Sequence, residues 1–302
     1  MNYLPITLLA YFFNAASVLI DKALLTTRIP NPLTYIFYIS LVSLLALVLL
    51  PFTSIPNPLV ITLASISTLL WSTAALLMFH AMKIGQASRV IPVIGTLVPL
   101  ILLGHSLQTG SLSIEQMLAV LLLVLGLILL TFFSWQGKFS KRELFLEVGS
   151  AILFAVSYLF LKQAYLQDDF LTVLTYSRLI LIPAGLILLV FPVSRKIVLA
   201  IDPTRPSFKI FSRVGLLFVT GQLLGGLSEI LITFSIALAS PALVNSLQGS
   251  LFAFLFLFSL VLNKPFPKIF QENLNPLTIS LKISGIFCIG IGIYLLSITN
   301  TG

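Results

Sequence analysis

The run IEQMLAVLLLVLGLILLTFFS, residues 114–134, is the clearest structural signal in the chain. After Glu115 it contains no charged residue, and nearly all of its side chains are apolar. About 20 such residues in a helix cross the roughly 30 Å hydrocarbon core of a bilayer. The run also lacks the alternation of polar and apolar residues that is typical of strands in membrane barrels. It therefore predicts a membrane-spanning helix.

The rest of the chain has the same character. Of its 302 residues 58% are hydrophobic and only 9% are charged, whereas soluble domains are about a quarter charged. We expect an all-α integral membrane protein of ten transmembrane helices, separated by polar or proline-containing breaks. The predicted spans lie near residues 3–25, 33–52, 59–81, 88–107, 114–134, 145–166, 171–192, 214–238, 242–262 and 279–298.

The two halves of the chain resemble each other, which predicts an internal duplication. We expect two five-helix repeats, residues 1–137 and 138–302. Because each repeat has an odd number of spans, the two would cross the membrane in opposite senses, as in transporters that work by alternating access. The matching residues are Leu33, Thr34 and Tyr38 against Leu171, Thr172 and Tyr176, and Ala119 and Gly126 against Gly285 and Gly292.

Basic residues are distributed unevenly between the connections. They follow odd-numbered spans and do not occur in the short loops after even-numbered spans. By the positive-inside rule the odd-numbered loops are cytoplasmic, which places both termini outside. A net charge of +8 would also suit a nucleic-acid binder, but the charges sit in connections rather than on one face, so we expect no nucleic-acid partner.

Ionisable side chains within the spans are candidates for function, because it is costly to bury them in a membrane. Glu229 in the eighth span is the strongest candidate for a substrate or proton site, and Lys162 and Arg178 could approach the same level. An ion pair that only stabilises the fold is the alternative. His80, near the end of the third span, could titrate near neutral pH. A purely interfacial position is the alternative for it.

Polar uncharged residues also occur in pairs within two spans. Asn14 and Ser17 in the first span are one turn apart, as are Asn245 and Gln248 in the ninth. Each pair could face a shared polar cavity. Hydrogen bonds between helices would explain the pairs equally well.

Signals for an enzyme are weak. The chain has 2 histidines and 1 cysteine, and it contains no H-E-x-x-H, C-x-x-C, P-loop or G-x-S-x-G motif. We therefore expect no catalytic residue, metal ion or cofactor. A membrane enzyme or lipid-handling protein that acts within the bilayer is the alternative, and it would require a tight polar cluster near one interface.

The chain resembles the drug/metabolite transporter superfamily, and within it the EamA-type family. The resemblance rests on ten spans in two halves, on FHAMKIGQAS at residues 79–88, on Pro99 and on the glycine-containing fifth and tenth spans. It covers nearly the whole chain. It implies a secondary transporter or facilitator of the plasma membrane that moves small polar metabolites such as amino acids outward. Protons are candidate coupling ions.

The resemblance also implies a central cavity lined by spans one, three, four, six, eight and nine. Arg178 stands where the family often has an arginine. Asn14 stands at about the depth where small multidrug relatives have a membrane-embedded carboxylate. Because the Asn14 amide cannot titrate, Glu229 is the remaining candidate for proton coupling. Family members usually have both termini in the cytoplasm, whereas the charge distribution of this chain predicts both termini outside. The resemblance leaves open whether the protein forms a homodimer. The expected site residues are Asn14, Ser17, His80, Tyr158, Arg178, Glu229, Asn245 and Gln248.

Overall fold

The structure is a computed structural model that describes residues 2–28, 32–84, 87–110, 112–131, 140–198, 213–262 and 275–299. Within these residues all regular secondary structure is helical. Nine of the described helical segments are long and apolar enough to cross a membrane. The chain is therefore an all-α, multi-pass membrane protein, as its composition predicts.

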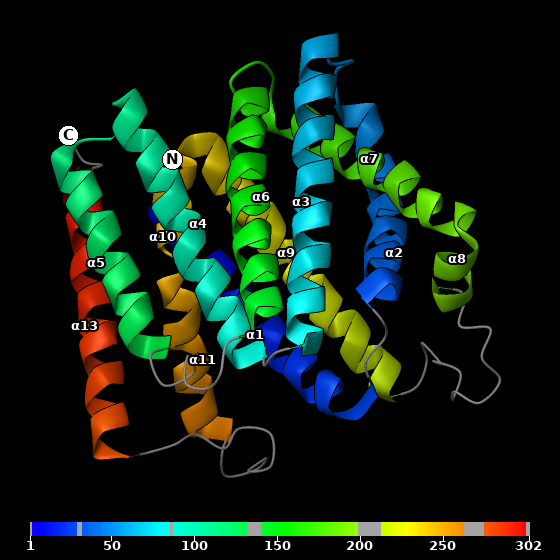
Figure 1. The fold of residues 1–302 in the computed structure, drawn as a ribbon. Helices are drawn as coiled ribbons and strands as arrows, with labels where there is room; N and C mark the ends of the chain where they lie inside the picture. Colours follow the sequence, from blue (N-terminus) through cyan, green and yellow to red (C-terminus); the bar gives the residue numbers. More distant parts are fainter. Residues whose placement is uncertain are drawn as a thin grey trace. The chain divides into compact units, whose positions relative to one another are not determined.

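The chain divides into two compact units, and each unit draws helices from both halves of the sequence (Figure 1). Unit 1 consists of Met1–Ile29, Ile91–Lys138 and Lys209–Gly302, and unit 2 of Pro30–Val90 and Phe139–Phe208. The compact units do not coincide with the two predicted repeats, residues 1–137 and 138–302. The repeats were inferred from sequence similarity and remain a prediction.

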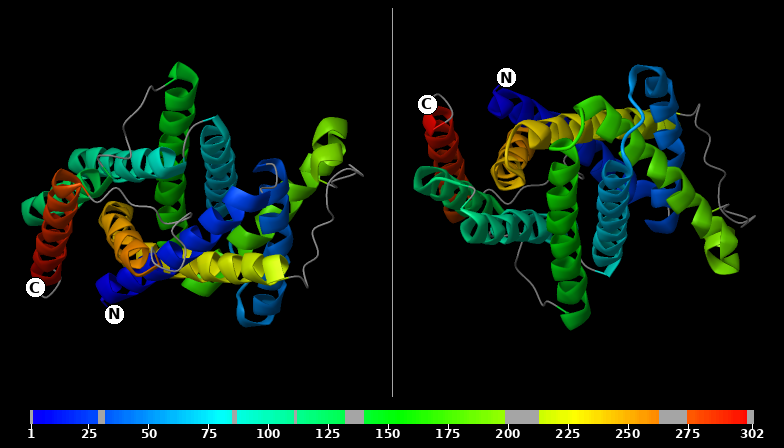
Figure 2. Two further views of the ribbon diagram at one scale, coloured as in Figure 1. Left: turned by 90° about the horizontal axis from the view of Figure 1, so that it is seen from below. Right: turned by 90° about the horizontal axis from the view of Figure 1, so that it is seen from above.

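Unit 1 holds the helices of the first, fourth, fifth, eighth, ninth and tenth predicted spans. Within it α1 packs along α9, and α5 packs along α13 (Figures 1 and 2). The last residues of the predicted fifth span, 132–134, lie outside the described part of the chain. The helices of unit 1 are α1 (Tyr3–Arg28), α4 (Ala87–Thr109), α5 (Ile114–Thr131), α9 (Arg213–Leu238), α10 (Pro241–Ser246), α11 (Gly249–Leu262) and α13 (Pro276–Thr299).

Small residues allow α5 and α13 to approach each other closely. A Cβ atom on Gly126 would stand 2.7 Å from the carbonyl oxygen of Gly285, and one on Gly292 would stand 3.2 Å from that of Ala119. These are the residues that match between the fifth and tenth predicted spans. Their pairing shows that the two helices run antiparallel. Close packing of this kind drives helix association in a membrane, where lipid tails are as apolar as the side chains.

Unit 2 holds the helices of the second, third, sixth and seventh predicted spans. The second predicted span is α-helical at first and continues as a 3₁₀ helix, and its apolar part Ile39–Phe52 is shorter than the nine long segments. α8 occupies the start of the long connection after the seventh span. The helices of unit 2 are α2 (Pro32–Val42), η1 (Ser43–Phe52), α3 (Pro58–Ile84), α6 (Lys141–Tyr165), α7 (Phe170–Val190) and α8 (Pro192–Val198).

Capping side chains define where two helices of unit 2 begin. The Ser140 hydroxyl accepts a hydrogen bond from the Glu143 amide (3.0 Å) at the start of α6. The Asp169 carboxylate accepts from the amides of Leu171 (2.9 Å) and Thr172 (3.0 Å) at the start of α7. Each cap satisfies amides that have no partner inside the helix.

Candidate functional site

The ninth predicted span is interrupted part-way along its length. α10 ends at Ser246 and α11 begins at Gly249. Around this point four backbone amides bond to carbonyls three residues back, at 2.9 to 3.3 Å, and they belong to Leu247, Gln248, Ser250 and Leu251. This is 3₁₀ geometry, which inside a longer helix often marks a functional hinge.

Tyr11 of α1 contacts the interruption and connects it to an acidic residue. Its hydroxyl donates a hydrogen bond to the carbonyl oxygen of Val244 (3.2 Å), and its side chain is buried. Glu229 of α9 lies close enough to Tyr11 for the two to interact electrostatically. Both stand near the middle of their spans, Tyr3–Ile20 and Val219–Leu238. Unit 1 therefore brings together a carboxyl group, a phenol and a distorted helix at mid-depth.

The predicted site residue Gln248 lies within this interruption, and Asn245 stands just before it, near the end of α10. The Asn245 amide nitrogen donates to the carbonyl oxygen of Pro241 (2.9 Å) in its own helix, and the side chain is buried. The Gln248 amide nitrogen lies 3.0 Å from where a Cβ atom on Gly95 of α4 would stand. Gly95 thus leaves room for a polar side chain against the α4 backbone.

α1, which carries Ser17 and Asn14, runs side by side with α9 in Figure 2. The Ser17 hydroxyl donates to the carbonyl oxygen of Gly221 (2.8 Å), and a Cβ atom on Gly225 would stand 3.0 Å from the same hydroxyl. Ser17 therefore makes a hydrogen bond between helices, one of its two expected roles. Half-buried Asn14 is three residues after Tyr11 and shares a face with it.

In unit 2, α3 joins α6 and α7 at one level. The Ser67 hydroxyl donates to the carbonyl oxygen of Ser157 in α6 (2.9 Å). The adjacent Thr68 hydroxyl donates to the carbonyl oxygen of Ser177 in α7 (3.1 Å). Because Ser67 and Thr68 are neighbours, the three helices meet at the same depth.

Two predicted site residues, Tyr158 and Arg178, occur at this level, since each directly follows one of the bonded serines. Arg178 is half-buried and lies near the middle of α7, about 12 Å from the first residue of that helix. Buried Tyr158 stacks on Phe154 with ring centres 6.4 Å apart, and Trp71 of α3 meets Phe154 edge-on at 6.0 Å. The sequence did not indicate the role of Trp71.

His80 lies apart from this level. Its Nδ1 atom is 2.8 Å from the carbonyl oxygen of Leu76 in its own helix. His80 is twelve positions after Thr68, which corresponds to about 18 Å along α3. Of the three predicted site residues in unit 2, the structure places Tyr158 and Arg178 at one level and His80 elsewhere.

Sequence reasoning missed two buried acidic residues of α6. Glu143 and Glu147 are 2% and 0% exposed. Glu143 lies just before the predicted sixth span and Glu147 is its third residue, where charged side chains usually reach water, so their position gave no signal. Packing against α3, where the Ser150 hydroxyl donates to the carbonyl oxygen of Ala74 (2.9 Å), covers this end of the helix.

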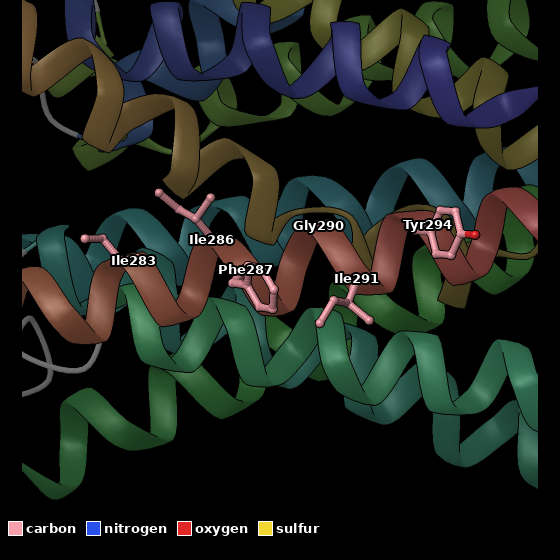
Figure 3. Close-up of a pocket in the computed structure, with 6 residues that line it drawn as sticks. All are labelled: Ile283, Ile286, Phe287, Gly290, Ile291 and Tyr294. Carbon is pink, nitrogen blue, oxygen red and sulfur yellow. The ribbon is translucent and has the colours of Figure 1, made fainter.

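A groove of about 540 Å³ follows one side of α13 and holds none of the predicted site residues (Figure 3). Most of its side chains are well exposed, and the Tyr294 hydroxyl is its polar side-chain group. This composition is that of a surface that faces lipid. The lining residues are Ile283, Ile286, Phe287, Gly290, Ile291 and Tyr294.

Comparison with known proteins identifies a shared fold but no family. No family model and no curated protein matches the chain. Solved structures do match, with 27 chains found. One of them, described as "Crystal structure of protein", aligns over 98% of this chain and 96% of its own length with a TM-score of 0.68 and 12% sequence identity. At that identity the likeness shows the fold alone.

Proposed function

We propose that the protein is a secondary transporter or facilitator that moves small polar metabolites, such as amino acids, outward across the plasma membrane by alternating access. The observation that carries this proposal is the interrupted ninth span, which Tyr11 contacts at mid-depth, with Glu229 near enough to Tyr11 to interact with it electrostatically. Transporters bind substrates and ions at discontinuous helices near the bilayer midplane, because irregular backbone there offers polar groups. The EamA-type resemblance supports the same function and substrate class.

An inverted repeat of five helices, residues 1–137 and 138–302, belongs to the proposal. In such a repeat the first span corresponds to the sixth, and the eighth to the third. The bond from Ser17 of α1 to Gly221 of α9 joins the first and eighth spans. The bond from Ser67 of α3 to Ser157 of α6 joins the third and sixth. Each bond joins the first helix of one repeat to the third helix of the other, which supports the repeat.

Two further observations support ten spans in opposite senses. α2 and η1 together cover Pro32–Phe52 and supply a tenth apolar segment. The antiparallel packing of α5 and α13, the fifth and tenth spans, is the arrangement that an inverted repeat requires, because the last helices of the two repeats then run in opposite directions.

Glu229 is the proposed coupling residue. A carboxyl group at mid-depth can accept a proton when it is open to one side of the membrane and release it when it is open to the other. Asn14, on the same face of α1 as Tyr11, cannot take this role because an amide does not titrate. Protons are accordingly the proposed coupling ions.

The test is a metabolite screen in proteoliposomes. Liposomes with and without the full-length protein are incubated with a mixture of amino acids and related polar metabolites, with and without an imposed proton gradient, and their contents are measured by mass spectrometry. We expect protein-dependent accumulation of at least one metabolite and a dependence on the gradient. Equal contents in the two kinds of liposome under all conditions would contradict the proposal and favour an enzyme that acts within the bilayer.

A further inference from the structure

The meeting point of α3, α6 and α7 in unit 2 has the chemistry of an anion-binding site. We propose that Arg178, with Trp71 and Thr175, binds a carboxylate or phosphate group of the transported solute. The inference rests on the proposed transport function and names the chemical class of the solute.

Arg178 is the charged centre of this site. The two hydrogen bonds from Ser67 and Thr68 hold α6 and α7 against α3 at its level. Ionisable residues at this depth face the protein interior or a polar cavity, because exposure to lipid is costly. A guanidinium group presents five donors in a planar fork that matches a carboxylate or a phosphate.

Two further donors, Thr175 and Trp71, stand within about one helical turn of the level of Arg178. Thr175 is three residues before Arg178, which places both on one face of α7. Its side chain is 0% exposed, and its hydroxyl has no hydrogen-bond partner among the described residues. Trp71 is one turn after Thr68 on α3, and its indole nitrogen is likewise buried without a hydrogen-bond partner in the described part of the chain. An indole nitrogen can only donate.

The local charge of unit 2 also favours an anion. Half-buried Lys162 stands one turn beyond Tyr158 on the same face of α6. The buried carboxyl groups of that helix are farther away, since Glu147 is ten residues before Ser157, which is about 15 Å along the axis. The polar and aromatic side chains named near the level of Ser157 and Arg178 are therefore cationic, hydroxyl-bearing or aromatic, and none is acidic.

The experiment compares ligands that differ only in the anionic group. The purified full-length protein in detergent is titrated with nicotinate and nicotinamide, with lactate and lactamide, and with glycerol 3-phosphate and glycerol, and binding is measured by calorimetry. We expect an anionic member of at least one pair to bind and its neutral partner to bind at least about tenfold more weakly, because hydrogen bonds between charged partners are lost. The pair that responds separates a carboxylate solute from a phosphate solute.

Variants then assign the binding to this cluster. R178Q should weaken the anion by at least about tenfold and W71F by several-fold, while R178K retains part of the affinity. Arg195 in α8 is exposed, so R195Q is the matched control and should bind as the wild type does. If R178Q does not fold, R178K and W71F decide the outcome.

Several results would overturn the proposal. The first is equal binding of the anionic and the neutral member of every pair, and the second is no binding of any anionic member. The third is unchanged anion binding in R178Q. If R178Q fails to fold, unchanged binding in both R178K and W71F takes its place. Uptake of a neutral metabolite in the liposome screen without anion binding would overturn this inference alone. Anion binding without uptake of any metabolite would instead overturn the transport function.

Discussion

A Cβ atom on Gly285 of α13 would stand 2.8 Å from the carbonyl oxygen of Gly126 in α5. Since backbone cannot move aside as a flexible side chain does, G285A should force the two helices apart and destabilise the protein by about 1 to 3 kcal/mol. The measurement is the thermal unfolding of the purified variant in detergent.

Gly290 provides the control on the same helix, because a Cβ atom there would meet no atom within 4 Å. G290A should change stability by less than about 1 kcal/mol. Equal losses in G285A and G290A would show that glycine matters in α13 for a reason other than contact with α5.

Asp169 should make the stability of unit 2 depend on pH. Burial alone would raise the pKa of its carboxyl group, but hydrogen bonds from Thr172 and Leu171 hold that pKa below its ordinary value. The lowered pKa means that the cap stabilises the fold above the ordinary value of about 3.9 and that this contribution is lost as the pH falls through the folded value.

Substitution separates the cap from other acidic groups. D169A should lose about 1 kcal/mol at neutral pH, while D169N should keep most of the cap and lose its pH dependence below pH 4. Chemical denaturation in detergent between pH 3 and pH 7 measures both. An unchanged pH profile in D169N would assign the acid sensitivity to other carboxyl groups.

Glu229 and Tyr11 should have separable roles in transport. E229Q removes the proton site and should abolish proton-dependent uptake in proteoliposomes while the protein still folds. Y11F removes the hydrogen bond to Val244, which is worth about 0.6 to 1.7 kcal/mol in a membrane, and should keep a proton dependence at reduced stability.

Glu115, exposed in the first turn of α5, is the matched control for charge removal. Uptake by E115Q should respond to the proton gradient as the wild type does. A gradient response that survives in E229Q would reduce Glu229 to a structural residue.

The orientation inferred from the basic connections can be tested with single cysteines in a C288S background. Ile55 is 92% exposed and Gln167 is exposed, and both follow even-numbered spans. In intact cells I55C and Q167C should react with a maleimide that cannot cross membranes, whereas K196C in α8 should react only after permeabilisation. The opposite pattern would place both termini in the cytoplasm, as the family resemblance implies.

The helical, membrane-spanning character of the chain follows from its sequence. In hydrocarbon every backbone amide and carbonyl must be satisfied locally, so apolar runs such as residues 114–134 have helix as their one structural solution. The sequence also matched Ala119 with Gly285 and Gly126 with Gly292, so small residues recur at equivalent positions of the fifth and tenth spans. In the structure the contacts cross these matches, since Gly126 lies against Gly285 and Gly292 against Ala119.

Tertiary structure decided what the polar residues do. In the sequence Ser17 and Asn245 are both polar side chains in apolar helices. In the structure Ser17 donates a hydrogen bond to a different helix, whereas Asn245 donates one to its own helix. The change to 3₁₀ geometry after Val244 was not predictable from the sequence, because residues 245–251 include no proline and no charged residue. Trp71 and Glu147 gave no signal because burial depends on which helix packs against them. Depth in the membrane can be counted along one helix, but the partners at that depth come from segments far apart in the chain.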